Sequence, residues 1–297
     1  MGVLEMVGRV IDPMAGMMRP PPGMEFDFSQ PTGEPALVEP ESLSWRIFKN
    51  PVTLFIGGVA AVILELGEPS VRSGIWDHSA FRQNAPLRLR RTGAAAMMTV
   101  YGPQSEARKM IARVVKMHEK VRGTTPDGRP YQANDPRLLD WVQATAAWGF
   151  IESYSRFACA LSPEERSRAL AEGAEAARLY GAKGAPTSTA EWENLLADTL
   201  PLLERSDIVF EFLAIMNNAP LLPRALRPLQ RLMIRAAVDL APPEVRSKLG
   251  LDHPTLSGAE EQLVTVTART ADRLPIRSAP PAQASIRMNR DPSFLYR

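Results

Sequence analysis

Cysteine is nearly absent from this chain, whose 297 residues include one, Cys159. A single thiol cannot form an internal disulfide, so the chain suits a reducing compartment. The N-terminus also lacks the basic region, the long apolar core and the small-residue cleavage site of a signal peptide, and we therefore expect a cytoplasmic protein. A formal net charge of +2 is too balanced to indicate nucleic acid as a partner.

The chain also lacks an apolar run long enough to cross a membrane. Its longest one, Val52 to Leu66, is shorter than the roughly 20 residues that a transmembrane helix needs, and it predicts a buried core helix. Glu65 lies in the last turn of that helix among apolar neighbours. If its carboxyl faces the interior, burial raises its pKa and makes it a plausible general base. The sequence is equally compatible with a Glu65 side chain that ends the helix in water.

Alternation of Val, Ile and Thr with polar residues is absent over any strand-length window, which predicts an all-α fold. Helical spacing begins near Ser44, and residues 41–274 are expected to form a single-domain helical bundle around one large core. Residues 1–40 and 275–297 are rich in proline, so we expect an extended N-terminal arm and a C-terminal tail.

Capping residues mark several of the expected helices. Asp135 followed by Pro136 begins one of them, and Ser162 with Glu165 forms a capping box that begins the next. The expected ranges are 103–121, 136–161, 163–180, a helix from about 188, 206–217, 223–239 and 257–273.

A basic stripe follows from the spacing of arginines on the helix expected over 223–239. Its members are Arg224, Arg227, Arg231 and Arg235. A solvated face is the simpler interpretation, and contact with an anionic membrane surface or an acidic partner is the alternative.

Two cationic segments point to a site for an anionic cofactor that contains a metal. Arg88, Arg91 and Thr92 have the spacing that places them on one face of a helix, where a guanidinium can grip a carboxylate such as a haem propionate. His118 lies on the apolar face of its predicted helix, in line with Ile111. An imidazole in dry surroundings resists protonation, and the neutral form is the one that ligates iron. A histidine buried in the core and solvated arginines would fit the same spacing.

Six short motifs occur along the chain in a set order. They are Asp77–Phe81, Arg88–Thr92, Tyr101–Gly102, His118–Gly123, Tyr131–Ala133 and Asp135–Thr145. In order and spacing, these motifs resemble the oxygenase family of latex clearing protein (rubber oxygenase) and the fungal MpaB oxygenases.

The resemblance implies a globin-like helical core that holds a b-type haem. On this basis His118 is the expected iron ligand, and the expected cofactor-binding residues are His118, Arg88, Arg91, Thr92 and Arg122. Arg88, Thr92 and Glu65 are the expected catalytic residues. The implied reaction uses dioxygen on a small apolar, isoprenoid-like substrate, with oxidative cleavage of a carbon-carbon double bond. The haem would supply the oxygen chemistry, and the protein would supply the pocket and its electrostatics.

The chain departs from the family pattern at two positions. Latex clearing protein has a lysine able to occupy the sixth coordination position where this chain has Arg91, and a protonated guanidinium has no lone pair to give to iron. The sixth position is therefore expected to be open or to hold water. Gln143 stands where many members of the family have a histidine, which puts any activity that needs a second imidazole in doubt.

Two other functions remain compatible with these residues. His78 and His118, with a carboxylate such as Asp77 or Glu119, could form a facial triad for non-haem iron if the fold brings them together. A protein that holds haem or an apolar ligand without turnover is the other alternative.

Overall fold

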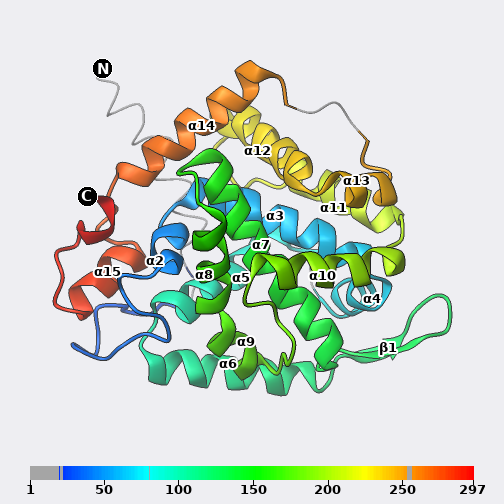
Figure 1. The fold of residues 1–297 in the computed structure, drawn as a ribbon, viewed down its shortest axis with the longest axis horizontal. Helices are drawn as coiled ribbons and strands as arrows, with labels where there is room; N and C mark the ends of the chain where they lie inside the picture. The colour runs from blue at the N-terminus through cyan, green and yellow to red at the C-terminus, as the bar shows by residue number, and fades with distance from the viewer. Residues whose placement is uncertain (1–19, 21–22, 80, 253–255) are drawn as a thin grey trace.

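α-Helices account for nearly all the regular structure in the computed structural model of this protein, which describes residues 20, 23–79, 81–252 and 256–297 (Figure 1). The all-α, single-domain prediction is confirmed. The described exception to helix is a small antiparallel hairpin of β1 (Arg122–Thr124) and β2 (Pro130–Gln132). The segment from β1 to the start of β2 includes Asp127–Gly128 and the prolines at 126 and 130, a composition typical of a turn-rich loop.

The centre of the molecule is a pair of long helices, α3 (Pro51–Gly67) and α7 (Pro136–Phe157). α7 begins as its sequence predicts, because Asp135 accepts a hydrogen bond from the first turn of the helix. Asn50 does the same for α3. The helices touch through backbone, because a Cβ atom added at Gly57 would lie 2.4 Å from the carbonyl oxygen of Gly149. Two glycines therefore allow an approach that larger side chains would prevent.

The other helices surround this central pair. In Figure 1, α12 and α14 lie on one side of it, and α6 and α9 lie on the opposite side. The bounds of the surrounding helices are α2 (Leu43–Phe48), α4 (Pro69–His78), α5 (Ala85–Tyr101), α6 (Gln104–His118), α8 (Pro163–Glu172), α9 (Ala174–Tyr180), α10 (Thr189–Thr199), α11 (Asp207–Asn218), α12 (Arg227–Leu240), α13 (Pro243–Leu249), α14 (Gly258–Arg273) and α15 (Pro280–Arg287).

Several helix boundaries differ from the sequence prediction: α7 ends at Phe157 rather than at residue 161, and α12 begins at Arg227 rather than at residue 223. The single helix expected over 163–180 is divided at Gly173 into α8 and α9, although its capping box at Ser162 and its left-handed C-cap at Gly181 are both present. α6 ends at His118 rather than near Val121. The chain turns there because Val121 donates its N–H to the His118 carbonyl, and the hairpin follows directly.

The C-terminal residues also differ from the extended tail that their prolines predict. They form α15, whose Arg287 is fully buried and donates hydrogen bonds to the carbonyl oxygens of Phe28, Glu34 and Tyr101. These bonds tie the described part of the N-terminal arm and the end of α5 to α15. Proline at the first turn of a helix has no amide to lose, so the two prolines begin α15 instead of preventing it.

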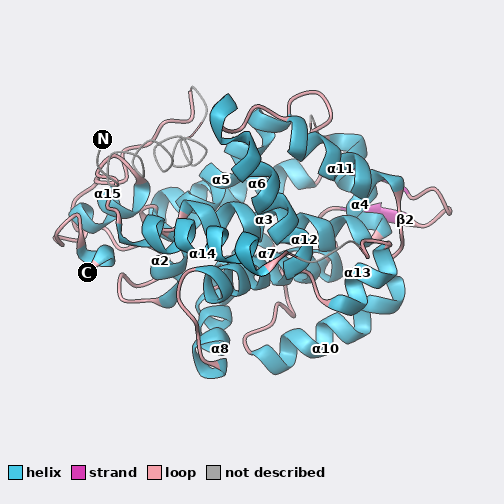
Figure 2. Cartoon of the chain, turned by 90° about the horizontal axis from the view of Figure 1, so that it is seen from above, coloured by secondary structure: helices cyan, strands magenta, loops and turns pink. Residues whose placement is uncertain are grey.

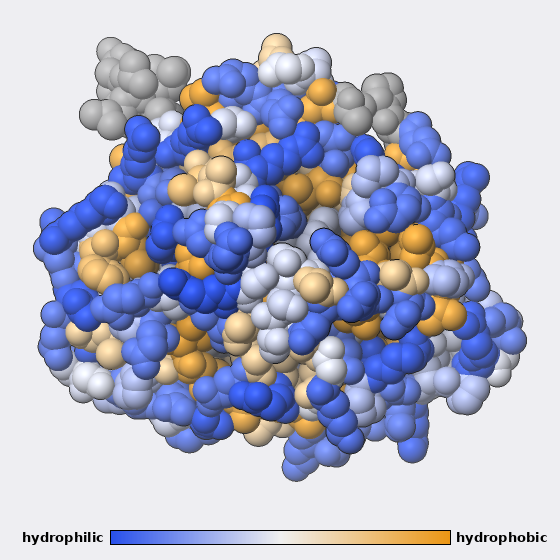
Figure 3. Space-filling view, viewed as in Figure 1, coloured by the Kyte–Doolittle hydropathy of each residue, from blue (hydrophilic) through white to orange (hydrophobic). Residues whose placement is uncertain are grey.

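The hairpin and the C-terminus lie at opposite ends of the molecule (Figure 2). On the face drawn in Figure 3, hydrophilic side chains predominate and apolar ones form small groups between them. The basic stripe lies at exposed positions, and its last member, Arg235, forms an ion pair with Glu260.

In the part of the chain that the structure describes, no single helix is long and apolar enough to cross a membrane. Helices α3 and α4 meet that test only when taken together, and they are bent by 110° where they join.

Substitution of Gly57 by alanine should destabilise the protein by about 2 to 3 kcal/mol, because the new methyl group would push α3 away from the α7 backbone. Gly58→Ala is the matched control on the same helix, since its Cβ would meet only the Phe150 ring at 3.7 Å. This variant should be neutral or more stable by up to about 1 kcal/mol, because alanine favours helix. Urea unfolding of both variants measures the difference, and equal stability of the two would contradict the close backbone contact.

Candidate functional site

The Glu65 side chain points into the protein interior. The residue is 9% exposed, and burial raises the pKa of its carboxyl from 4.5 to about 7. The charge of Arg88 and a hydrogen bond from Thr145 act in the opposite direction and lower the pKa. The structure thus decides between the two interpretations that the sequence left open, in favour of the buried one. A carboxyl with a pKa near neutrality can both take up and release a proton at physiological pH.

Arg88 extends from the first turns of α5 and is tied to its own helix. Its Nη1 donates to Thr92 Oγ1 at 3.1 Å, and the Thr92 hydroxyl donates to the Arg88 carbonyl oxygen, also at 3.1 Å. The side chain is solvent-accessible, yet burial lowers its pKa. A guanidinium stays protonated even when its pKa is lowered, so Arg88 is a cation.

His118 ends α6, and the hairpin region holds that end in place. The Asn134 side chain donates to the Val115 carbonyl at 3.1 Å, one turn before His118, and Val121 N–H donates to the His118 carbonyl at 2.9 Å. Burial and the nearby charge of Arg88 lower the pKa of His118, so the ring is neutral at physiological pH. Its Nδ1 atom is buried and has no hydrogen-bond partner among the described residues.

Arg88 connects the two other groups. Its charge lowers the pKa of Glu65 and also lowers the pKa of His118, so the guanidinium acts electrostatically on both the carboxyl and the imidazole. These residues come from α3, α5 and α6. The fold therefore brings together three of the residues singled out from the sequence.

Arg91 and Arg122 have looser relations to this group. Arg91 is exposed on α5, and its charge lowers the pKa of Arg88. Arg122 is exposed on β1, where it pairs with Gln132 of β2, and no effect of its charge on Glu65, Arg88 or His118 is resolved.

The facial triad suggested as an alternative is not assembled. His78 shares a hydrogen bond of 3.2 Å with the Tyr131 hydroxyl, at the end of α4. Within the described ranges, no three His, Cys, Asp or Glu side chains come close enough together to hold a metal ion.

Thr145 is the site residue that the sequence reasoning passed over. It lies inside the motif Asp135–Thr145, but its role is visible only once α7 is packed on α3. Its hydroxyl is fully buried and 3.5 Å from Glu65 Oε1. A polar residue on an otherwise apolar, buried stretch of helix was the available signal.

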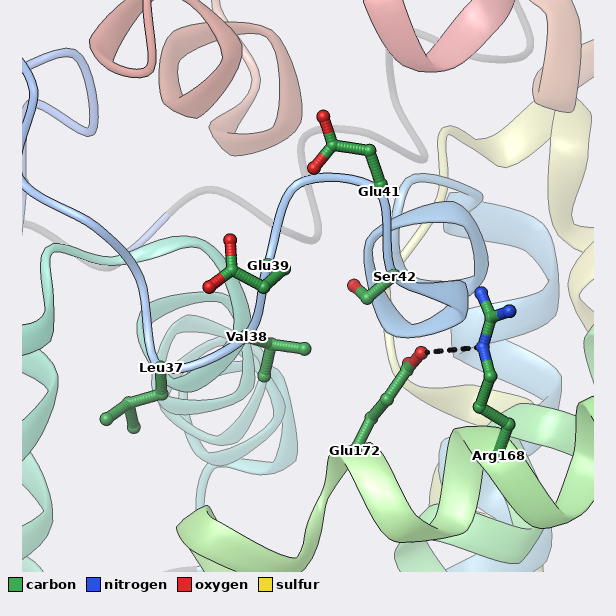
Figure 4. Close-up of a pocket in the computed structure, with 7 residues that line it drawn as sticks. All are labelled: Leu37, Val38, Glu39, Glu41, Ser42, Arg168 and Glu172. Carbon is green, nitrogen blue, oxygen red and sulfur yellow. Dashed lines mark hydrogen bonds and ion pairs between the residues drawn. The ribbon is translucent and has the colours of Figure 1, made fainter.

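Two surface cavities of about 380 Å³ each lie apart from this group, since neither is lined by Glu65, Arg88 or His118. In the one that Figure 4 shows, Glu172 of α8 pairs with Arg168, and its carboxylate accepts hydrogen bonds from the backbone amides of Leu43 and Ser44. Glu172 thus caps the start of α2, which is a structural role. Neither cavity contains the residues that the sequence singled out, so neither is taken as the candidate site.

A family model described as "ER-bound oxygenase mpaB/B'/Rubber oxygenase, catalytic domain" matches residues 45–273 of this chain. The match covers more than half of the chain and agrees with the resemblance of the six motifs. Comparison with curated proteins and comparison with solved structures gave no match.

Glu65→Gln should stabilise the protein in a pH-dependent way. The folded state binds the Glu65 proton more tightly than the unfolded state, so the free energy of unfolding of the wild type falls as the pH rises from 4.5 to about 7. The difference corresponds to about 3 kcal/mol above pH 7, at about 1.4 kcal/mol per pKa unit, and glutamine avoids it.

Urea unfolding of both proteins between pH 4 and 8 measures this difference in the free energy of unfolding. Glu193→Gln, at an exposed position of α10, controls for the loss of a carboxylate charge. A constant difference between wild type and Glu65→Gln over this range would show that the carboxyl is not desolvated.

Proposed function

Because this chain belongs to the oxygenase family of MpaB and rubber oxygenase, we propose that it is a haem-dependent oxygenase that acts on a small apolar, isoprenoid-like substrate. Oxidative cleavage of a carbon-carbon double bond is the reaction that the family suggests. The observation that carries the proposal is the grouping of a neutral histidine, a cation and a buried carboxyl with a pKa near 7.

The residues present fit a b-type haem. His118 would hold the iron, because its ring is neutral and is therefore able to donate a lone pair. Its buried Nδ1 lacks a partner among the described residues, so the imidazole is not already held by another side chain through that nitrogen. Arg88, Arg91 and Arg122 supply cationic donors suited to the propionate carboxylates. When bound, haem would supply the chemistry with dioxygen.

Arg91 and Thr92, both on α5, have different proposed parts in the site. A guanidinium stays protonated and has no lone pair, so Arg91 would not compete with dioxygen for a coordination position. Thr92 holds the Arg88 guanidinium through a hydrogen bond of 3.1 Å. A cation held in this way can stabilise negative charge that develops during the reaction.

Glu65 is proposed as the proton acceptor. With a pKa of about 7 it is partly ionised at neutral pH, which is the condition for efficient general base catalysis. Its burial among apolar side chains of α3 also suits the removal of a proton from an allylic carbon of an apolar substrate. Arg88 lowers the pKa of Glu65 and so favours the ionised form that accepts the proton.

Replacement of His118 tests the haem assignment. The wild type should show an intense Soret band, and His118→Ala should lose most of it because the iron ligand is gone. His78→Ala is the matched control, since His78 is engaged with Tyr131 and should not be needed for haem. Added imidazole should restore part of the band in His118→Ala. Full haem content with an unchanged spectrum in His118→Ala would exclude His118 as the ligand.

Glu65→Gln should separate the two roles in the site. The variant should retain haem content, because Glu65 is not a ligand, while turnover with an isoprenoid substrate should fall by roughly 10²- to 10⁴-fold, as for the loss of a general base. Oxygen uptake and product formation measure turnover, and the Soret absorbance measures haem. Turnover equal to that of the wild type would remove Glu65 from the mechanism.

A further inference from the structure

The Thr145 hydroxyl lies where α7 meets the end of α3. It is fully buried, and three oxygen atoms surround it: the carbonyl oxygens of Trp141 at 3.0 Å and Val142 at 3.1 Å, and Glu65 Oε1 at 3.5 Å. A hydroxyl has one proton, so it can donate to only one of these acceptors at a time. The Thr145 proton therefore points either to a backbone carbonyl of α7 or to the Glu65 carboxyl of α3.

The protonation state of Glu65 determines which oxygen accepts the Thr145 proton. An ionised carboxylate is the strongest acceptor of the three, because a hydrogen bond to a charged group is about twice as strong as one between neutral groups. When Glu65 is protonated, its own O–H can donate to Thr145 Oγ1, and the Thr145 proton then turns to the Trp141 carbonyl, an ordinary bond for threonine within a helix. In both states the Thr145 hydroxyl and Glu65 Oε1 are hydrogen-bonded.

We propose that Thr145 is a positioning residue for Glu65: its hydroxyl donates a hydrogen bond to the ionised carboxyl and accepts one from the neutral carboxyl, so that Glu65 and Thr145 stay hydrogen-bonded to each other in both protonation states. This inference rests on the proposed function of Glu65 as a proton acceptor. In this proposal α7 contributes to the reaction through Thr145, in addition to its packing against α3.

Few other groups act on the Glu65 carboxyl. Arg88 of α5 supplies the charge, and Thr145 of α7 supplies the hydrogen bond. Arg72 of α4 and Glu68, the N-cap of α4, lie near the same end of α3. Arg72 is paired with Glu204, and Glu68 is paired with Arg137. On α14, Asp272 is paired with Lys49 at the other end of α3, and the α12 carboxylate Asp239 is paired with Arg156 and Arg246.

The direct test is a titration of the Glu65 carboxyl in the full-length protein by infrared spectroscopy. The carbonyl band of the protonated carboxyl is assigned by its loss in Glu65→Gln. Thr145→Val keeps the branched shape of threonine and removes the hydroxyl, so the pKa of Glu65 should rise and its ionisation constant should fall about tenfold, which corresponds to about 1.4 kcal/mol. Thr145→Ser keeps the hydroxyl and should restore most of the wild-type value.

Thr145→Ala provides a second variant without the hydroxyl if valine disturbs the fold. The rising limb of the pH profile of turnover should shift to higher pH in both variants that lack the hydroxyl. A Glu65 titration in Thr145→Val and Thr145→Ala that equals the wild type would overturn the inference, as would a shift in Thr145→Ser as large as that in valine. If the titration shifts as expected while Glu65→Gln keeps full turnover, the positioning role stands and the proposed role of Glu65 in catalysis fails.

Discussion

The contact between the backbones of α3 and α7 is the constraint on which the rest of this structure depends. Gly57 and Gly149 let the two helices touch, and the Ser153 hydroxyl donates to the Thr53 carbonyl at 2.8 Å one turn away. Because the helices run in opposite directions, this register places Glu65, two turns further along α3, against Thr145, one turn earlier in α7. A bulkier residue at either glycine would move the carboxyl away from its partner.

The contact between α3 and α7 also explains why the site lowers the stability of the folded protein. A carboxyl that is held in an apolar interface has a raised pKa, and its ionisation at neutral pH opposes folding. Arg88 and Thr145 offset part of that cost without removing it. A core built only for stability would have a glutamine or leucine at this place.

The peripheral elements hold the other two helices of the site. Arg287 of α15 donates to the carbonyl of Tyr101, the last residue of α5, and Asn134 donates to the carbonyl of Val115 near the end of α6. The segments that look least structured in the sequence, the proline-rich C-terminus and the turn-rich stretch after α6, therefore fix the helices that bear Arg88 and His118. This explains why neither segment is a simple tail or loop.

The sequence by itself determined the fold class, the helix starts at Asp135 of α7 and Ser162 of α8, and the family, because these depend on local spacing and on short motifs. It also singled out Glu65, Arg88 and His118 as candidate site residues. Only the tertiary structure decided that Glu65 is buried, that Thr145 faces it, and that Arg88 acts on both Glu65 and His118. Burial and electrostatic coupling arise between helices that are distant in the sequence, and no pattern within one helix contains them.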